Sequence, residues 1–478
     1  MKSMVRMRTI RLALLVFGMS ICAIAQTSSQ SQTGTTPAPA FGQTAPMLNP
    51  ENPPVSGLDE PRLELGNAGG SFISPALQVS ESADTNGGNQ FGNTGLESIT
   101  SVLGALDLQQ FWPKSDLFFE YLGGGAFYSS PYDVQQLQAA GVQAVTRWRT
   151  GQVTVRDSFS YLPDGSFSMG TYGGYPGLGL TIGSMGLGGQ GGALPGGQQF
   201  GNGQFGSVEN IPLLANTAIL DVEQSLSPVS AITAAGGFSN AHFYDSANCS
   251  NPENICLIDS DQVTIQGGYS RLLSRHDQIG GIYDFQRFQF PQSTGGRVTN
   301  QLANVLWSHT LTGRMSFSAG AGPQHTDLQQ SVQIKSWSVS ARVELRYRFA
   351  HSSMAATYQK FTSTGSGFFA GADTQAARFE YTRSLGRTWN FYGDLGYSHN
   401  KNLQLGFVGV NASNYDEGFA GAVLRKHLGR SYDFFAAYRF SEVAFNVPAC
   451  FNGSCGNNAQ QHIGSVGVEW HPRPTRIE

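Results

Sequence analysis

A row of charged side chains alternates with apolar ones in the last third of the chain. Between residues 341 and 349, Arg342, Glu344, Arg346 and Arg348 alternate with Ala341, Val343, Leu345, Tyr347 and Phe349. Because successive side chains of a β-strand point to opposite faces, this spacing gives one apolar face and one charged face. Charges along a pore wall select solutes by sign and size, whereas neighbours of opposite sign form salt bridges that brace the wall. The sequence leaves both roles open.

Similar strand-like runs carry further charged residues. Tyr432, Phe434, Ala436, Tyr438 and Phe440 alternate with Asp433 and Arg439, and the runs near Phe391 and Trp470 follow the same pattern. We predict that the charged faces line a pore, and the residues predicted there besides the first four are Arg378, Glu380, Asp394, Arg439 and Glu469. Arginines facing acids across a narrow pore would create a transverse field, whereas paired charges would leave it weakly selective.

Residues of catalytic type lack the spacing and the partners that an active site needs. Ser and His adjoin at His351-Ser352-Ser353 and at Ser398-His399, but the sequence places no acid or amide beside either pair. The Gly177-Leu-Gly179 run lacks the third glycine and the strand-to-helix context of a dinucleotide site. We therefore expect no enzymatic activity and no cofactor.

Four cysteines form two local pairs, Cys249 with Cys256 and Cys450 with Cys455. Neither pair has the two-residue spacing or the nearby histidines that are typical of a zinc site. Local pairs in an exported chain favour disulfides within loops, so we predict two disulfides and no metal.

The first 25 residues predict export. Lys2, Arg6, Arg8 and Arg11 precede an apolar run, and a small-residue site follows at Ala23-Ile24-Ala25, so a signal peptide would be removed before Gln26. Lipidation at Cys22 is the alternative, but Ile21 is large for the residue before a lipidated cysteine. No later run approaches the roughly 18 apolar residues of a membrane helix, which excludes a helical inner-membrane protein.

Residues 26 to 68 are rich in Ser, Thr, Gln, Pro and Ala without periodicity, which predicts a disordered periplasmic leader. Docking of this leader to a periplasmic partner is the alternative. Loss of the four basic residues of the signal leaves 25 basic and 33 acidic residues, a net charge of −8. This balance makes nucleic acid an unlikely partner.

A hairpin repeat follows the leader. Eight short polar turns separate strand-like runs, and several share a Leu-Gly-Arg or Leu-Ser-Arg sequence; they begin at Trp112, Arg149, Ser225, Leu273, Leu311, Phe349, Leu385 and Leu428. An opening strand near Phe72 to Ser82 and a closing strand from Gln461 to Trp470 bring the count to 18, or 16 if the strand near Phe72 does not form. This pattern predicts an all-β transmembrane antiparallel up-and-down barrel over residues 69–470, with a periplasmic tail at 471–478.

The positions of the tryptophans indicate that the predicted turns lie at one level of the barrel. Trp112, Trp148, Trp307, Trp389 and Trp470 all lie within about four residues of a predicted turn or of the barrel's end, as in the aromatic girdle of a membrane barrel. A long interruption, residues 170–206, holds 16 glycines and predicts a flexible loop. This loop either folds into the lumen as a constriction or stays outside.

At the level of architecture, residues 69–470 resemble the porin-like β-barrels of Gram-negative outer membranes. The resemblance implies an outer-membrane location, contact with lipid and passive diffusion of small hydrophilic solutes, and carbohydrates are the first solute class to test. Export of an exopolysaccharide, with the leader touching a periplasmic export component, and a surface scaffold or adhesion barrel are the alternatives. The sequence leaves open whether the barrels form homo-trimers.

Overall fold

The computed structural model describes residues 71–86, 95–129, 135–162, 213–243, 258–291, 296–312, 314–329, 333–349, 351–363, 369–403, 414–451, 454–473 and 475–477. All belong to one of the chain's two units, Pro37–Glu478, and only that unit is described. The predicted signal peptide and leader, the glycine-rich loop 170–206, and Cys249 and Cys256 lie outside the described residues. The described residues contain no helix long and apolar enough to cross a membrane.

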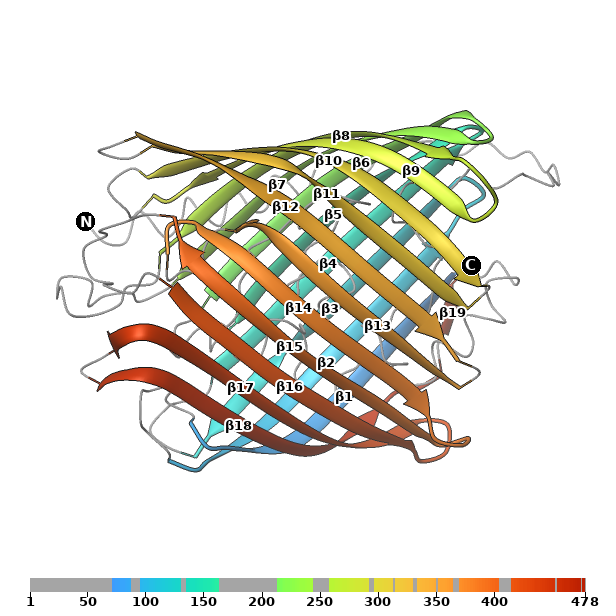
Figure 1. Cartoon of the computed structure of the whole chain (residues 1–478). Coiled ribbons are helices and arrows are strands. Elements are labelled where there is room, and N and C mark those ends of the chain that lie inside the picture. The colour runs from blue at the N-terminus through green and yellow to red at the C-terminus, as the bar shows by residue number, and fades with distance from the viewer. Residues whose placement is uncertain are drawn as a thin grey trace, which may run out of the picture. The chain divides into compact units, whose positions relative to one another are not determined.

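Eighteen antiparallel strands form a closed barrel (Figure 1), as the sequence predicts, so the alternative of 16 is wrong. Each strand pairs with its neighbours in sequence, and β1 closes the ring by pairing with β18. The strands are β1 Ser71–Asp84, β2 Glu97–Phe111, β3 Ser115–Tyr128, β4 Gln135–Trp148, β5 Gly151–Leu162, β6 Leu213–Ser227, β7 Ser230–Phe243, β8 Ser260–Leu272, β9 Asp277–Gln289, β10 Arg297–Thr312, β11 Met315–Gln329, β12 Gln333–Arg348, β13 Ser352–Ser363, β14 Ala372–Ser384, β15 Trp389–Asn402, β16 Asn414–His427, β17 Tyr432–Phe451 and β18 Ser454–Trp470.

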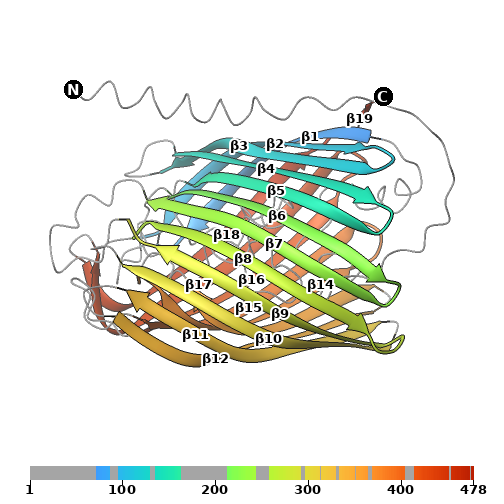
Figure 2. The ribbon, with the colours of Figure 1, turned by 90° about the horizontal axis from the view of Figure 1, so that it is seen from above.

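All eight predicted turns connect strands at one end of the barrel (Figure 2). The Leu-Gly-Arg turns need their glycines, because Gly386 and Gly429 have φ angles of 84° and 83°. Side chains with a Cβ rarely adopt this left-handed region. The recurring sequence of these turns therefore has a backbone cause.

One short element was not predicted. Within the predicted C-terminal tail, Thr475–Ile477 forms β19, which pairs antiparallel with Ser71–Ile73 at the start of β1. This pairing extends the sheet beyond Trp470 at the end of the barrel where the short turns lie.

The outer wall is apolar. Large hydrophobic side chains are exposed on strand after strand, among them Leu77, Val155, Leu220, Ile265, Tyr283, Val305, Leu395, Tyr438 and Val466. A closed barrel pairs all of its backbone groups internally and can place such side chains in lipid without cost. The alternation that predicted the strands thus assigns one set of positions to lipid and the other to the interior.

The wall is not uniform between β12 and β13. These strands pair only from Ala341 with Lys360 to Arg348 with Ser353, whereas β11 and β12 pair along the whole length of β12. Residues 333–340 of β12, toward the end of the barrel opposite the short turns, are separate from β13, at the left of Figure 1. At that end β13 instead meets the inner side of β11, where the Gln324 amide donates to the Thr362 hydroxyl.

Candidate pore lining

The predicted charged row of β12 lies on the inner side of the wall. Val339 and Val343, on the opposite parity, are exposed on the outer surface. Arg342 Nη2 lies 3.3 Å from Glu344 Oε2, and Arg346 Nε donates to Glu344 Oε1. Glu344 is therefore held between two arginines, so the wall-bracing role predicted as one alternative exists here. Arg348 at the end of the row is exposed, and it forms no ion pair with the described residues.

The remaining predicted residues occupy β14, β15, β17 and β18. Arg378 is half-buried and is the register partner of Gly396, and Glu380 is the register partner of Asp394. The side chains of Glu380 and Asp394 lie outside the description. Arg439 on β17 is half-buried and interacts electrostatically with the buried Glu417 of β16.

Glu469 belongs to a buried ion cluster that the sequence did not reveal. Arg425 Nη1 of β16 lies 3.0 Å from Glu469 Oε2 and 3.4 Å from Asp433 Oδ2, and all three side chains are less than 5% exposed. The imidazole of His427 lies 2.7 Å from the second oxygen of Asp433, and His471 lies 3.6 Å from it. Since Glu469 has no exposed surface, it can influence a solute only through the residues that cover it. Pairing of β16, β17 and β18 creates the cluster, so no local pattern could have shown it.

Uncharged polar side chains line a second part of the interior, from β9 to β15. Asn300 donates to Gln286 at 3.2 Å and accepts from Thr326 at 3.2 Å, and Thr374 donates to Asn400 at 2.8 Å. These contacts connect register partners on neighbouring strands. We call this set the amide–hydroxyl belt, and it consists of Gln286, Asn300, Gln324, Thr326, Thr362, Ser363, Thr374, Ser398 and Asn400.

The belt is buried, and not all of its polar atoms have hydrogen-bond partners. Gln324 Oε1, in the belt, and Gln266 Nε2, beside it on β8, have no hydrogen-bond partner among the described residues. A buried polar atom without a partner is costly, so such an atom normally meets water or a ligand. Gln324 and Gln266 are themselves almost completely buried, so a solute could reach these two atoms only if the side chains that cover them moved.

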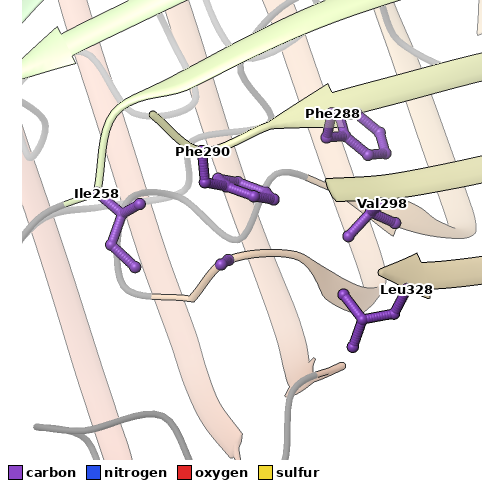
Figure 3. Packing of buried hydrophobic residues seen from close by; sticks show 6 residues of the cluster. Ile258, Phe288, Phe290, Val298 and Leu328 are labelled. Atoms are coloured by element: carbon purple, nitrogen blue, oxygen red, sulfur yellow. The ribbon is translucent and has the colours of Figure 1, made fainter. Parts of the chain in front are cut away.

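An apolar cluster, shown in Figure 3, lies on the inner side of the wall next to the belt, near the strand ends opposite the short turns. Phe288 lies near the end of β9 and Phe290 directly after it, and Val298 and Leu328 come from β10 and β11. Ile258, Ala370 and Leu403 complete the cluster. Ala370 precedes β14, so this contact brings the start of β14 to the inner side of β9, β10 and β11. On the other side, the ring of Phe369 contacts that of the buried Tyr415 of β16, with ring centres 5.3 Å apart and the two planes tilted by 55°. Residues 369–371 thus connect two parts of the wall inside the barrel.

Other predicted features have definite positions. Ser398 is buried in the belt, whereas His399 lies on the outer side with its imidazole 2.6 Å from Asp416, so the two residues do not form a catalytic pair. Cys450 and Cys455 are register partners on β17 and β18, and their disulfide stays a prediction. Among the described residues, no group of His, Cys, Asp or Glu could hold a metal ion.

The closed wall, the apolar outer face and the polar interior together are those of a transmembrane β-barrel. An even number of strands brings both ends of the barrel to the side of the short turns, which in bacterial outer-membrane barrels is the periplasmic side.

Comparison with known proteins finds likeness in structure alone. No protein-family model matches the chain, and no curated protein matches it in sequence. Pseudomonas aeruginosa OpdQ is similar with a TM-score of 0.42 and 11% identity, over 84% of this chain and 99% of that chain. The FrpB iron transporter from Neisseria meningitidis has a TM-score of 0.40 and 8% identity, over 84% and 82% of the two chains. The ferric-catecholate import receptor Fiu from E. coli K12 has a TM-score of 0.41 and 7% identity, over 84% and 81%.

Proposed function

We propose that the barrel is a channel for the passive diffusion of small, uncharged, hydrophilic solutes, with carbohydrates as the solute class. The observation that carries the proposal is the amide–hydroxyl belt, in which uncharged inward side chains of neighbouring strands donate to and accept from one another. Amides and hydroxyls both donate and accept hydrogen bonds, as the hydroxyls of a sugar do. The belt residues themselves carry no charge, and their charged neighbour on β9, Asp284, is buried and accepts from Gln286.

The charges of the interior support the same proposal. Arg342 and Arg346 share Glu344, Arg156 lies 3.3 Å from Asp221, and Arg425 is paired with two acids. Pairs of opposite charge largely cancel each other's field at the distance of a solute in the lumen. A lumen lined in this way discriminates by size and hydrogen bonding more than by the sign of a charge.

The proposal is tested by planar-bilayer recording of the purified chain with and without a linear oligosaccharide. Stepwise conductance that the sugar blocks in a saturable manner is expected. Thr326→Val and Thr374→Val remove belt hydroxyls without changing side-chain shape, and each breaks a hydrogen bond of about 1 kcal/mol that holds the amide of Asn300 or Asn400 in place. If the ordered belt favours the sugar, each variant should weaken the block by up to about fivefold. Thr217→Val is the matched control, because Thr217 is a buried hydroxyl on β6 outside the belt. Equal effects of all three variants would contradict the role of the belt.

Absence of any conductance would contradict the channel itself and leave a surface scaffold as the function to test. The belt does not distinguish uptake from export of a polysaccharide. Sugar added to one side of the bilayer at a time distinguishes a lumen that is accessible from both ends from one that is not.

A further inference from the structure

The ends of β12 and β13 opposite the short turns differ in how their side chains are covered. Five successive residues of β12, residues 333–337, are exposed. Because successive side chains of a strand point to opposite faces, neither face of this end is covered. Three successive residues of β13, residues 361–363, are buried, so that end is covered on both faces. The two neighbouring strand ends therefore do not occupy equivalent places in the wall.

The end of β13 lies on the inner side of β11. Thr362 has the same parity as Tyr358, whose side chain is exposed on the outer wall, so Thr362 points away from the lumen. It meets the inward amide of Gln324, which donates to the Thr362 hydroxyl. The outward face of one strand end thus packs on the inward face of another strand, and two layers of wall overlap here.

The edge of β12 that this overlap leaves free fits the end of β13. Within the described part of the chain, residues 333–340 of β12 have no strand partner on the β13 side. The ladder stops at the pair of Ala341 with Lys360, and the pairs that would continue it are Ser340 with Phe361, Val339 with Thr362 and Ser338 with Ser363. The parities agree, since Val339 and Thr362 both point outward. The end of β13 can therefore extend the ladder without a shift of register.

The level of the free edge favours such pairing. Ser340 is the ninth residue from Arg348 at the short-turn end, and a strand of about 9–11 residues crosses the hydrocarbon layer. Val339 and Trp337 face outward and are 57% and 74% exposed, as expected of side chains at the boundary of that layer. Lipid offers no hydrogen bonds to backbone groups, so this edge gains from a strand partner.

We propose that the end of β13, residues 361–363, is a gate with two positions. In the β11 position, which this structure shows, it lies against Gln324, and in the β12 position it pairs with the free edge of β12. Its movement carries the start of β14 with it, because Ser363 is the register partner of Ala372. Two alternative packed arrangements of one element are the basis of a conformational switch.

The gate acts on the lumen through residues 369–371. Ala370 packs in the apolar cluster on the inner side of β9, β10 and β11, and Phe369 contacts Tyr415 on β16. These contacts cross the interior, so the β11 position narrows it. Transfer to the β12 position draws residues 369–371 toward the wall and uncovers the belt at Gln324. The inference rests on the proposed function, since it states how that channel opens.

Cysteine pairs and a short bifunctional thiosulfonate test the two positions in membranes that contain the full chain. Gln324→Cys/Thr362→Cys reports the β11 position, and Val339→Cys/Thr362→Cys reports the β12 position. Val343→Cys/Tyr358→Cys is the matched control, because these outward register partners lie four residues further along the same ladder and are paired in both positions. Peptide mass spectrometry identifies the bridged residues, so the native cysteines are retained.

We expect bridges in all three variants. If the control pair is bridged but positions 339 and 362 are not, the end of β13 never reaches β12 and the proposal is overturned. A missing bridge between positions 324 and 362 would overturn it equally, because the end of β13 would then never lie inside β11.

Recording in planar bilayers tests the effect on the lumen. Relative to the same protein after reduction, the bridge between positions 339 and 362 should raise the single-channel conductance and the bridge between positions 324 and 362 should lower it, whereas the control bridge should leave it unchanged. Equal conductance with and without both test bridges would overturn the gate. A chain that forms both bridges but never conducts would contradict the proposed channel together with the gate, whereas loss of one bridge contradicts the gate alone.

Discussion

Replacement of Arg425 by methionine should be among the most destabilising single changes in the barrel. The guanidinium lies 3.0 Å from Glu469 and 3.4 Å from Asp433, and both carboxylates are almost completely buried. At an effective dielectric constant of about 20, each contact corresponds to about 5 kcal/mol of Coulomb attraction, which mainly offsets the cost of burying the charges. Arg425→Met keeps the length of the side chain but leaves two buried acids without it. We expect a loss of about 3–5 kcal/mol in the free energy of unfolding.

The assay is urea unfolding of the barrel in lipid vesicles, followed by tryptophan fluorescence. Arg147→Met is the matched control, because Arg147 forms a short ion pair with Asp116 but is half exposed, with an expected loss of at most about 1 kcal/mol. Addition of Glu469→Gln to Arg425→Met should restore part of the stability, since one buried charge disappears. The reasoning is refuted if Arg425→Met costs no more than Arg147→Met, or if the second change gives no recovery.

Three further predictions concern the lumen and its rim. The first replaces the inward arginines of β12, Arg342, Arg346 and Arg348, by glutamine. Loss of three positive charges should shift the reversal potential in a salt gradient toward cation selectivity. An unchanged reversal potential would mean that these charges do not face the conducting path. Cys450 and Cys455 should resist alkylation until a reductant is added, and labelling of the unreduced protein would exclude the disulfide. Gly371→Ala should lower the free energy of unfolding by about 1–2 kcal/mol, because φ at this residue is 98° and an added Cβ would lie 3.2 Å from both Val298 and Leu403. An unchanged melting temperature would contradict this expectation.

The sequence predicted the features that depend on the alternation of side chains within one strand or on the residues of one turn. The alternation from Ala341 to Phe349 gave the inward placement of Arg342 to Arg348, because a strand fixed by its neighbours has only two faces. The turns were equally local, since Gly386 and Gly429 mark positions that need a positive φ. Strand number followed from counting these signals.

Features formed by residues far apart in the sequence could not be predicted from it. The ion cluster of Arg425, Asp433 and Glu469 depends on the register of three strands, which no single run of residues contains. The separation of β12 from β13, and the contact of Phe369 with Tyr415 inside the barrel, depend on the paths of segments between strands. Loops of this kind carry no period from which their course can be inferred.

Single-channel recording of the purified full-length chain in a planar bilayer tests the central claim most directly. The account predicts discrete conductance steps, weak ion selectivity because Arg156, Arg342, Arg346 and Arg425 are paired with acids, and saturable block by a linear oligosaccharide that the belt variants weaken. A bilayer that stays silent at every voltage, or a conductance that the sugar leaves unchanged, would contradict it.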